Sequence, residues 1–216
     1  MSEQMSLNLR NNPYKGKLIA FEGTDGAGKT TLINKTTEWL RTKLGDDNVL
    51  CVKQPTDMSR KTKLFQKMMY YCANHEDIDY RAVQLLTMSD RIQHGTEVIE
   101  PALKAGKTVI CDRYIFTSLA NMLARGFNEE TWFFEVAKNL LKPDFTFLAY
   151  VNPSIAISRI RSRPEERERH LNEELLKRVA LNFIEMAERE SFIVLDTSGN
   201  ADSPFSIIKN ELGEIV

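Results

Sequence analysis

The feature of this chain that most constrains its fold is a glycine-rich run, FEGTDGAGKTT, at residues 21–31. It satisfies the pattern G-x-x-x-x-G-K-[ST], with Gly23, Gly28, Lys29 and Thr30 at the defining positions. Glycines allow the backbone to curl until several N–H groups converge on phosphate oxygens. The lysine then reaches the β- and γ-phosphates, and the threonine hydroxyl binds Mg²⁺. We therefore expect the phosphates of a triphosphate to be bound by Gly23, Thr24, Asp25, Gly26, Ala27, Gly28, Lys29, Thr30 and Thr31.

The segments on either side of this run support the prediction. Leu18–Phe21 is an apolar run of strand length, and apolar residues such as Leu32, Ile33 and Leu40 follow at helical spacing. A strand, a glycine turn and a helix is the order that a phosphate-binding loop requires, because the helix N-terminus also attracts the anion. The alternative is a glycine-rich turn in an unrelated α/β protein, which this context disfavours.

Strand-like runs and helical patterns alternate along the whole chain. The expected strands are Leu18–Phe21, Val49–Val52, Thr108–Cys111, Phe145–Val151 and Phe192–Leu195. Alternation of this kind predicts the α/β class, with a central parallel sheet of five strands and helices on both faces. Residues 79–104 read as one long helix that Pro101 kinks near its end.

The sequence also predicts the limits of the domain. Residues 1–14 are mostly polar, and we expect them to form a disordered arm ahead of a single domain at 15–216. Residues 161–172, RSRPEERERHLN, are too polar to be buried and read as a mobile loop between two helices.

Composition narrows the range of partners. The net charge of −1 creates no general attraction to nucleic acid or to membranes, and no apolar stretch approaches the length of a membrane span. The three cysteines form no C-x-x-C pair, and buried reduced thiols in a cytoplasmic protein are the simplest interpretation. We expect small-molecule nucleotides as partners, in the cytoplasm.

A second motif, Asp112-Arg113-Tyr114, follows an apolar strand. Ligands of parallel α/β sheets bind at the carboxyl ends of the strands. Asp112 is therefore expected to hold the Mg²⁺ shell through water, with Arg113 facing a phosphate. A surface ion pair between the two residues is the alternative.

Arginines elsewhere have two interpretations each. Arg91, within a helix, either directs its guanidinium at a base or phosphate or lies in solvent paired with Asp90 or Glu97. The run from Arg159 to Arg169, interleaved with glutamates, is either a solvated charged loop or a source of cations that close on a phosphoryl group in transit.

Together these residues resemble the thymidylate kinase family of nucleoside monophosphate kinases. The resemblance spans residues 17–200. Its features, in order, are the run at 23–31, Arg91 ahead of VIEPAL at 98–103, Asp112-Arg113-Tyr114, Lys142-Pro143-Asp144, and the arginine-rich segment after Asn152-Pro153. It implies a P-loop kinase fold with a mobile lid at about 161–172, and transfer of the ATP γ-phosphoryl group to dTMP with Mg²⁺.

The resemblance also assigns roles by position. Asp25 contacts the sugar 3′-hydroxyl, Arg113 holds the acceptor phosphate, and Arg91 approaches the base. Arg159 flanks adenine, and residues 197–200 close that pocket. The implied catalytic residues are Lys29, Arg113, Arg163, Arg167 and Arg169; Asn200 joins Arg159 at the ATP; Thr30 and Asp112 serve the metal. The implied acceptor residues are Asp25, Gln54, Pro55, Thr87, Arg91, Arg113, Thr117, Ser118 and Asn121. Family members are commonly homodimers packed through long helices, here residues 79–104.

The sequence departs from the family pattern around the acceptor. Thr87 stands where an aromatic residue is usual, and Phe65, Tyr70 or Tyr71 of the preceding helix is a candidate to replace that aromatic. Asn121 replaces a tyrosine that crowds the sugar 2′ position, and residues 54–57 keep only the proline of E-P-G-G. A kinase of a different or modified nucleotide or nucleoside therefore stays open as an alternative. A nucleotide-dependent switch is a remote one, because the chain lacks the base-reading N-K-x-D motif.

Overall fold

The computed structural model describes residues 7–71, 77–164 and 171–215, and its centre is a parallel sheet. The strand order is β2-β3-β1-β4-β5, and every neighbouring pair is parallel. The strands are β1 (Leu18–Glu22), β2 (Val49–Lys53), β3 (Thr108–Asp112), β4 (Phe145–Tyr150) and β5 (Ile193–Asp196). This confirms the predicted fold class and all five strands.

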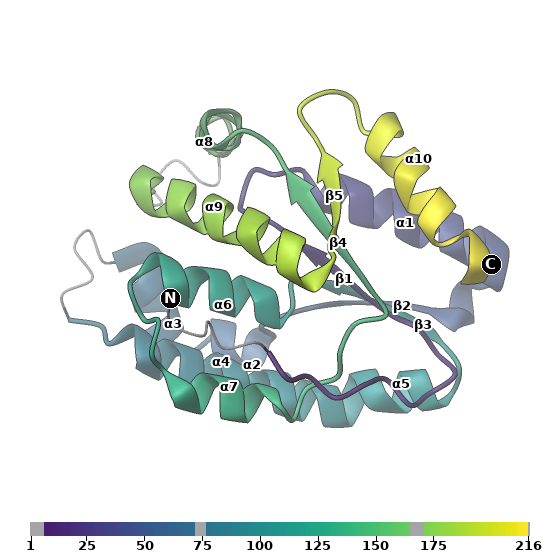
Figure 1. The fold of residues 1–216 in the computed structure, drawn as a ribbon, viewed down its shortest axis with the longest axis horizontal. Helices are drawn as coiled ribbons and strands as arrows, with labels where there is room; N and C mark the ends of the chain where they lie inside the picture. The colour runs from purple at the N-terminus through teal and green to yellow at the C-terminus, as the bar shows by residue number, and fades with distance from the viewer. Residues whose placement is uncertain (1–6, 72–76, 165–170, 216) are drawn as a thin grey trace.

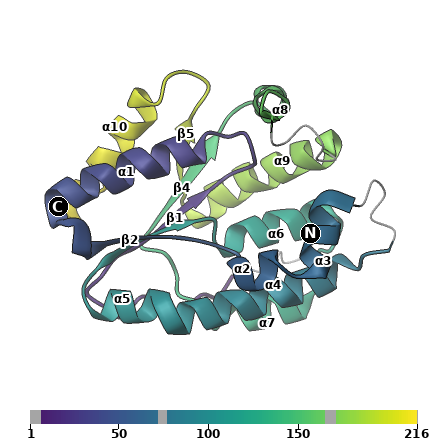
Figure 2. The same cartoon turned by 180° about the vertical axis from the view of Figure 1, so that it is seen from behind.

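Helices cover both faces of the sheet (Figures 1 and 2). Ile19 and Phe21 of β1 point into a core shared with α1, α8 and α10, whereas Leu18 and Ala20 point into the core on the other side. Because both faces are covered, all of β1 is buried, which is why it reads as a continuous apolar run. The helices of eight or more residues are α1 (Lys29–Leu44), α4 (Tyr80–His94), α6 (Ile115–Ala124), α8 (Pro153–Arg161), α9 (Glu173–Glu190) and α10 (Asp202–Glu211). The shorter ones are α2 (Asp57–Arg60), α3 (Lys63–Gln66), α5 (Glu100–Lys104) and α7 (Thr131–Ala137).

The helix expected at 79–104 is continuous but not uniform. Asp79 caps α4, since its side chain accepts the backbone N–H of Arg81. A π-helical turn, Gly95–Ile99, then joins α4 to α5. The turn ends two residues before Pro101, which has no N–H and whose ring conflicts with the carbonyl of Glu97, four residues earlier and within the turn. The proline therefore changes the helical winding near the end that the sequence indicated.

Residues 7–14, which we expected to be disordered, are instead held against the domain. Leu7 is buried, and Arg10 pairs with Leu141 in an isolated parallel bridge. The Glu100 carboxylate accepts hydrogen bonds from Arg10 and from the hydroxyl of Tyr14, both at 2.7 Å. Apolar and charged residues of the arm thus find partners on α5 and before β4. Residues 1–6 lie outside the described part.

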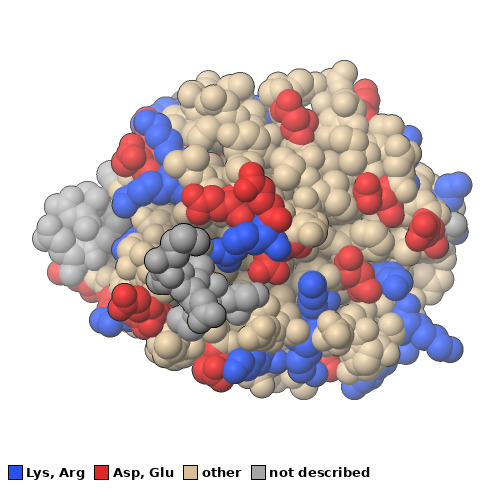
Figure 3. Space-filling view, in the orientation of Figure 1, with Lys and Arg blue, Asp and Glu red and all other residues tan. Residues whose placement is uncertain are grey.

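The surface and the cysteines complete the description. Acidic and basic side chains are interspersed over the face in Figure 3. Within the described residues, no helix is both long and apolar enough to cross a membrane. Cys111 is buried as expected, but Cys51 is exposed because β2 is an edge strand.

Candidate functional site

The glycine-rich run forms a tight loop between β1 and α1. Gly28 precedes the helix with a φ of 80°, a left-handed conformation that side chains rarely adopt. A Cβ on Gly23 would lie 2.3 Å from the carbonyl oxygen of Ala149 on β4. Both glycines are therefore required by geometry, as expected for a phosphate-binding loop.

Lys29 is the first residue of α1 and is 7% exposed. Its ammonium group donates to the carbonyl oxygens of Gly23 (2.9 Å) and Thr24 (2.7 Å), so the side chain lies along the loop. Burial, with the nearby charge of Arg113, lowers the pKa of Lys29 from 10.5 to about 7. Thr30, in the same first helical turn, is exposed. The loop thus presents a cation and a hydroxyl beside the helix N-terminus.

Arg159 and the segment after β5 close on the other side of this loop. Arg159 donates to the carbonyl oxygens of Gly26 (3.4 Å) and Thr197 (2.8 Å). The Thr197 hydroxyl in turn donates to the carbonyl of Ala27 at 2.8 Å. Asn200 accepts the backbone N–H of Asp202 at the start of α10. Of the residues that the resemblance assigned to adenine, Arg159 and Thr197 thus contact the loop directly.

Arg113 lies at the centre of the site, directly after β3. Its φ of 67° is unusual for a residue with a side chain, and strained conformations of this kind gather at functional sites. The guanidinium bonds Asp25 Oδ1 at 2.6 Å, the Gly23 carbonyl at 3.0 Å and the Thr117 hydroxyl at 3.2 Å. Burial alone would lower its pKa, but the Asp25 and Asp112 carboxylates outweigh that effect and raise it. Arg113 therefore stays a cation next to the phosphate loop.

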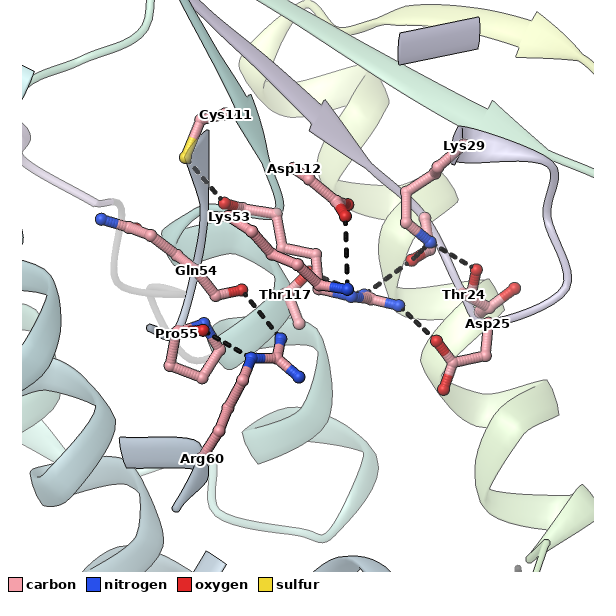
Figure 4. A network of polar contacts seen from close by, with 12 residues as sticks. Thr24, Asp25, Lys29, Lys53, Gln54, Pro55, Arg60, Cys111, Asp112 and Thr117 are labelled. Carbon is pink, nitrogen blue, oxygen red and sulfur yellow. Dashed lines mark hydrogen bonds and ion pairs between the residues drawn. The ribbon is translucent and has the colours of Figure 1, made fainter. Parts of the chain in front are cut away.

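Asp112 fits a Mg²⁺ site. Figure 4 shows Asp25, Lys29, Asp112 and Thr117 gathered around one part of the site. The Oδ1 atom of Asp112 is buried and has no hydrogen-bond partner among the described residues, while Oδ2 lies 3.7 Å from Nζ of Lys53. Mg²⁺ keeps several waters and uses one or two carboxylates together with substrate phosphates. A buried carboxylate oxygen without a partner matches that need.

A cavity of about 350 Å³ opens beside this centre. Its walls come from the loop before α2, from α3, α4 and α6, and from the N-terminal half of α9. The predicted acceptor residues that line it are Asp25, Pro55, Thr87, Arg91, Arg113, Thr117, Ser118 and Asn121. Gln54 does not line it: its buried side-chain amide contacts Nδ1 of His94 at 3.1 Å. The structure thus brings together all of the set except Gln54.

Arg91 is buried, which excludes the interpretation that it lies in solvent. The side chain is 1% exposed, and its Nη2 donates to the Tyr114 carbonyl at 3.0 Å. Its Nε and Nη1 atoms have no hydrogen-bond partner in the described structure. Asp90 faces elsewhere, accepting the Thr56 hydroxyl and backbone N–H before α2. A buried cation with unused donors on a cavity wall indicates a ligand group there.

Phe65 and Tyr70, two of the three residues offered by the sequence in place of an aromatic at Thr87, line the cavity. The side chain of the third, Tyr71, lies outside the described part. Two arginines of the cavity wall were missed by sequence reasoning. Arg60 donates to the Pro55 carbonyl at 2.6 Å, and Arg125 lies 3.9 Å over the Tyr80 ring. The segments that carry these arginines contain mixed polar and apolar residues, so no local pattern marks their positions.

The described part of the lid reaches only its two ends. Arg161 ends α8 and forms an ion pair with Glu173, which begins α9. Arg163 follows α8 and is exposed. Arg167 and Arg169 lie outside the described residues. So does most of the loop, and its mobility therefore stays a prediction.

The chain is similar to known proteins of one family. A model of the family described as "Thymidylate kinase" matches residues 21–204. A "Probable thymidylate kinase" from Pyrococcus abyssi is 35% identical over 176 residues, covering 81% of this chain and 84% of that protein. A "Thymidylate kinase" from Geobacillus sp. (strain WCH70) is 34% identical over 201 residues, covering 89% and 94%.

A solved structure shows the same fold. The thymidylate kinase of Ehrlichia chaffeensis superposes with a TM-score of 0.65, at 22% identity, covering 91% of this chain and 99% of that one. The structure thus contains the glycine-rich loop, Arg113 and the cavity lined by the predicted acceptor residues, which we call the acceptor cavity. By the family model and these relatives, the chain belongs to the thymidylate kinase family of nucleoside monophosphate kinases.

Proposed function

We propose that this protein transfers the γ-phosphoryl group of ATP to dTMP, giving dTDP, with Mg²⁺ as cofactor. The observation that carries the proposal is the position of Arg113, whose guanidinium lies between the phosphate loop and the acceptor cavity. In-line transfer brings the donor and acceptor phosphates close together, and a cation beside them neutralises the charge on their oxygens. Arg91 lies at the end of the cavity that we expect to hold the base, and its Nε and Nη1 atoms are unused donors there.

Catalysis by these residues rests on positioning and charge. Backbone N–H groups of the loop and Lys29 hold the ATP phosphates, and Arg113 and Arg60 lie where the acceptor phosphate enters. Thr30 and Asp112 would hold Mg²⁺, which neutralises charge on the phosphate oxygens. The acceptor phosphate oxygen attacks the γ-phosphorus while the bond to the β-phosphate oxygen breaks. The protein therefore needs no covalent intermediate.

We expect this protein to distinguish dTMP from other nucleoside monophosphates less strongly than a protein with a tyrosine at position 121 would. The Asn121 amide is engaged with the Thr117 carbonyl (2.9 Å) and with Arg125 (2.8 Å), so it leaves space rather than a contact near the sugar. We expect dTMP to be accepted, with dUMP and UMP also turned over. Ratios of kcat/KM in a coupled ADP-release assay measure this. The expected preference is small, because substrates that differ by about one methylene group are separated by only about 1–3 kcal/mol in transition-state free energy.

The variant Asn121→Tyr is the matched test of this prediction. It should raise the preference for dTMP over UMP while leaving the KM for ATP unchanged. Strict preference for dTMP in the unmodified protein would show that the cavity is selective by other contacts. Turnover of a nucleoside or modified nucleotide with none of dTMP would favour the alternative kinase.

The pKa of Lys29 predicts a pH dependence of ATP use. With a pKa of about 7, Lys29 is largely neutral in the free protein above pH 7. Bound phosphates favour the charged form, so binding must then take up a proton. The kcat/KM for ATP should fall as pH rises from 7 to 9, by at most about tenfold per unit.

Lys29→Arg is the control, because a guanidinium stays charged throughout this range. Its activity should be lower, and its profile should lack the fall above pH 7. Calorimetry in buffers of different ionisation enthalpy counts the proton directly. A flat profile for the unmodified protein between pH 7 and 9 would contradict the assignment.

We further propose a homodimer that packs through the α4 face. Leu85 on α4 is 52% exposed and Met58 on the neighbouring α2 is 47% exposed, so both leave apolar surface uncovered. Leu85→Glu should convert a dimer into a monomer in light-scattering measurements. Leu181→Glu, at a 62% exposed position on α9, is the control and should change nothing. A monomeric unmodified protein would overturn the proposal.

We also propose a cytoplasmic location, because ATP and nucleoside monophosphates are available there. Fractionation of cells carrying the tagged chain tests this placement.

A further inference from the structure

Glu22 is a buried carboxylate to which the proposed reaction gives no role. It ends β1, directly before the phosphate loop, and is 0% exposed. It does not line the acceptor cavity. Burial raises its pKa, although the Thr117 hydroxyl and the charges of Arg113 and Arg91 act in the opposite direction. A charge in such a place needs specific partners.

Those partners all belong to the first turn of α6. Oε1 of Glu22 accepts the backbone N–H groups of Tyr114 (2.9 Å) and Thr117 (3.2 Å), and Oε2 accepts the Thr117 hydroxyl. Tyr114 occupies the N-cap position of α6 and makes no side-chain cap of its own. Glu22 therefore supplies the acceptors that the helix start lacks, from a different strand.

The Thr117 hydroxyl connects this anchor to Arg113. Its proton goes to Glu22, so an oxygen lone pair is free to accept the bond from Nη1 of Arg113. The backbone of Arg113 immediately precedes the anchored turn and has a φ of 67°. Both the main chain and the guanidinium of Arg113 are thus fixed through the same two residues.

We propose that Glu22 is a positioning residue that acts through Thr117 to hold Arg113 toward the acceptor phosphate. The proposal rests on the proposed function only in assigning the acceptor phosphate to Arg113. Asp25 has a different position: it contacts Arg113 from the side of the phosphate loop, and it lines the cavity itself. Glu22 acts without touching either substrate.

Glu22→Gln tests the direction of the hydrogen bonds with almost no change in shape. An amide nitrogen in place of Oε2 is a donor, so the Thr117 proton loses its acceptor and Arg113 loses a fixed partner. We expect kcat/KM for dTMP to fall roughly 10- to 100-fold, with the dissociation constant for Mg·ATP changed less than about twofold. Thr117→Val should behave alike, and Thr117→Ser, which keeps the hydroxyl, should restore most of the activity.

Combination with Arg113→Ala separates positioning from general stability. The dissociation constant for dTMP, measured by calorimetry, should rise on Glu22→Gln alone but change less than about twofold when the substitution is added to Arg113→Ala. An undiminished effect in that background, or an equal loss of Mg·ATP and dTMP binding, would overturn the proposal. Full activity of Glu22→Gln would do the same. If Glu22→Gln does not fold, Thr117→Val completes the same cycle. If the unmodified protein has no activity toward dTMP, that result would instead count against the proposed function.

Discussion

Replacement of Lys29 by alanine is expected to lower kcat by about 100- to 1,000-fold or more, the effect typical of one preorganised charge removed from a transition state. Lys29 is the cation at the N-terminus of α1, and in this structure it lies over the carbonyl oxygens of Gly23 and Thr24. The charge on a transferring phosphoryl group is spread over its equatorial oxygens, where an ammonium group can stabilise it. A coupled ADP-release assay at saturating substrates measures the loss.

The fold should persist in this variant. Burial disfavours the charge of Lys29, so its removal relieves desolvation, and thermal unfolding should show a Tm equal to or above that of the unmodified protein. Lys35→Ala is the control: Lys35 lies on the same helix, and its amine pairs with Asp202 at the exposed surface. It should leave kcat unchanged. Near-normal turnover by a folded Lys29→Ala protein would contradict the role assigned to Lys29 at the transferring phosphoryl group.

The fold could be predicted from the sequence because its signals are local. Parallel strands buried on both faces appear as short apolar runs, and all five were found within one or two residues of their ends. The phosphate loop and Asp112-Arg113 were found because their function demands specific residues at fixed spacing. The helix at 79–104 was found from its periodicity, whereas its π turn follows from the position of one proline.

The acceptor cavity could be predicted only in part, because it is assembled from segments far apart in the chain. Arg91, Thr117 and Asn121 were placed through the resemblance, and they do line the cavity. Arg60 and Arg125 were missed, since an arginine in an amphipathic segment gives no sign of where it points. The ordered residues 7–14 were missed for a similar reason: their partners, such as Leu141, are distant in sequence.

One residue offered a signal that could have been used. Glu22 ends the otherwise apolar run LIAFE, and a carboxylate in a strand buried on both faces demands donors from elsewhere in the fold. Tertiary structure was needed to identify those donors as the first turn of α6. The buried charge of Glu22 thus marked a place in the fold where donors had to converge.

The lid arginines carry the second large prediction. Arg163, Arg167 and Arg169 are each to be replaced by alanine, and at least one variant should lose about 10³-fold or more in kcat, the range known for arginines that reach a transferring phosphoryl group. The loop that carries them starts after α8 and ends at α9, and the ion pair between Arg161 and Glu173 joins its two ends. Helices α8 and α9 pack against each other, so the loop returns close to where it left.

The affinity for ATP decides between an arginine that acts in the transition state and one that only binds the nucleotide. The active lid arginine should lower kcat far more than it raises the dissociation constant for Mg·ATP, because its contact forms mainly in the transition state. Arg159→Ala is the contrasting variant. Arg159 bonds the loop and Thr197 beside the expected adenine site, so its loss should weaken ATP binding more than it lowers kcat.

If all three lid variants keep normal kcat, the loop is a solvated run of charge. The catalytic arginine must then be sought among the arginines that line the acceptor cavity, which are Arg60, Arg91, Arg113 and Arg125.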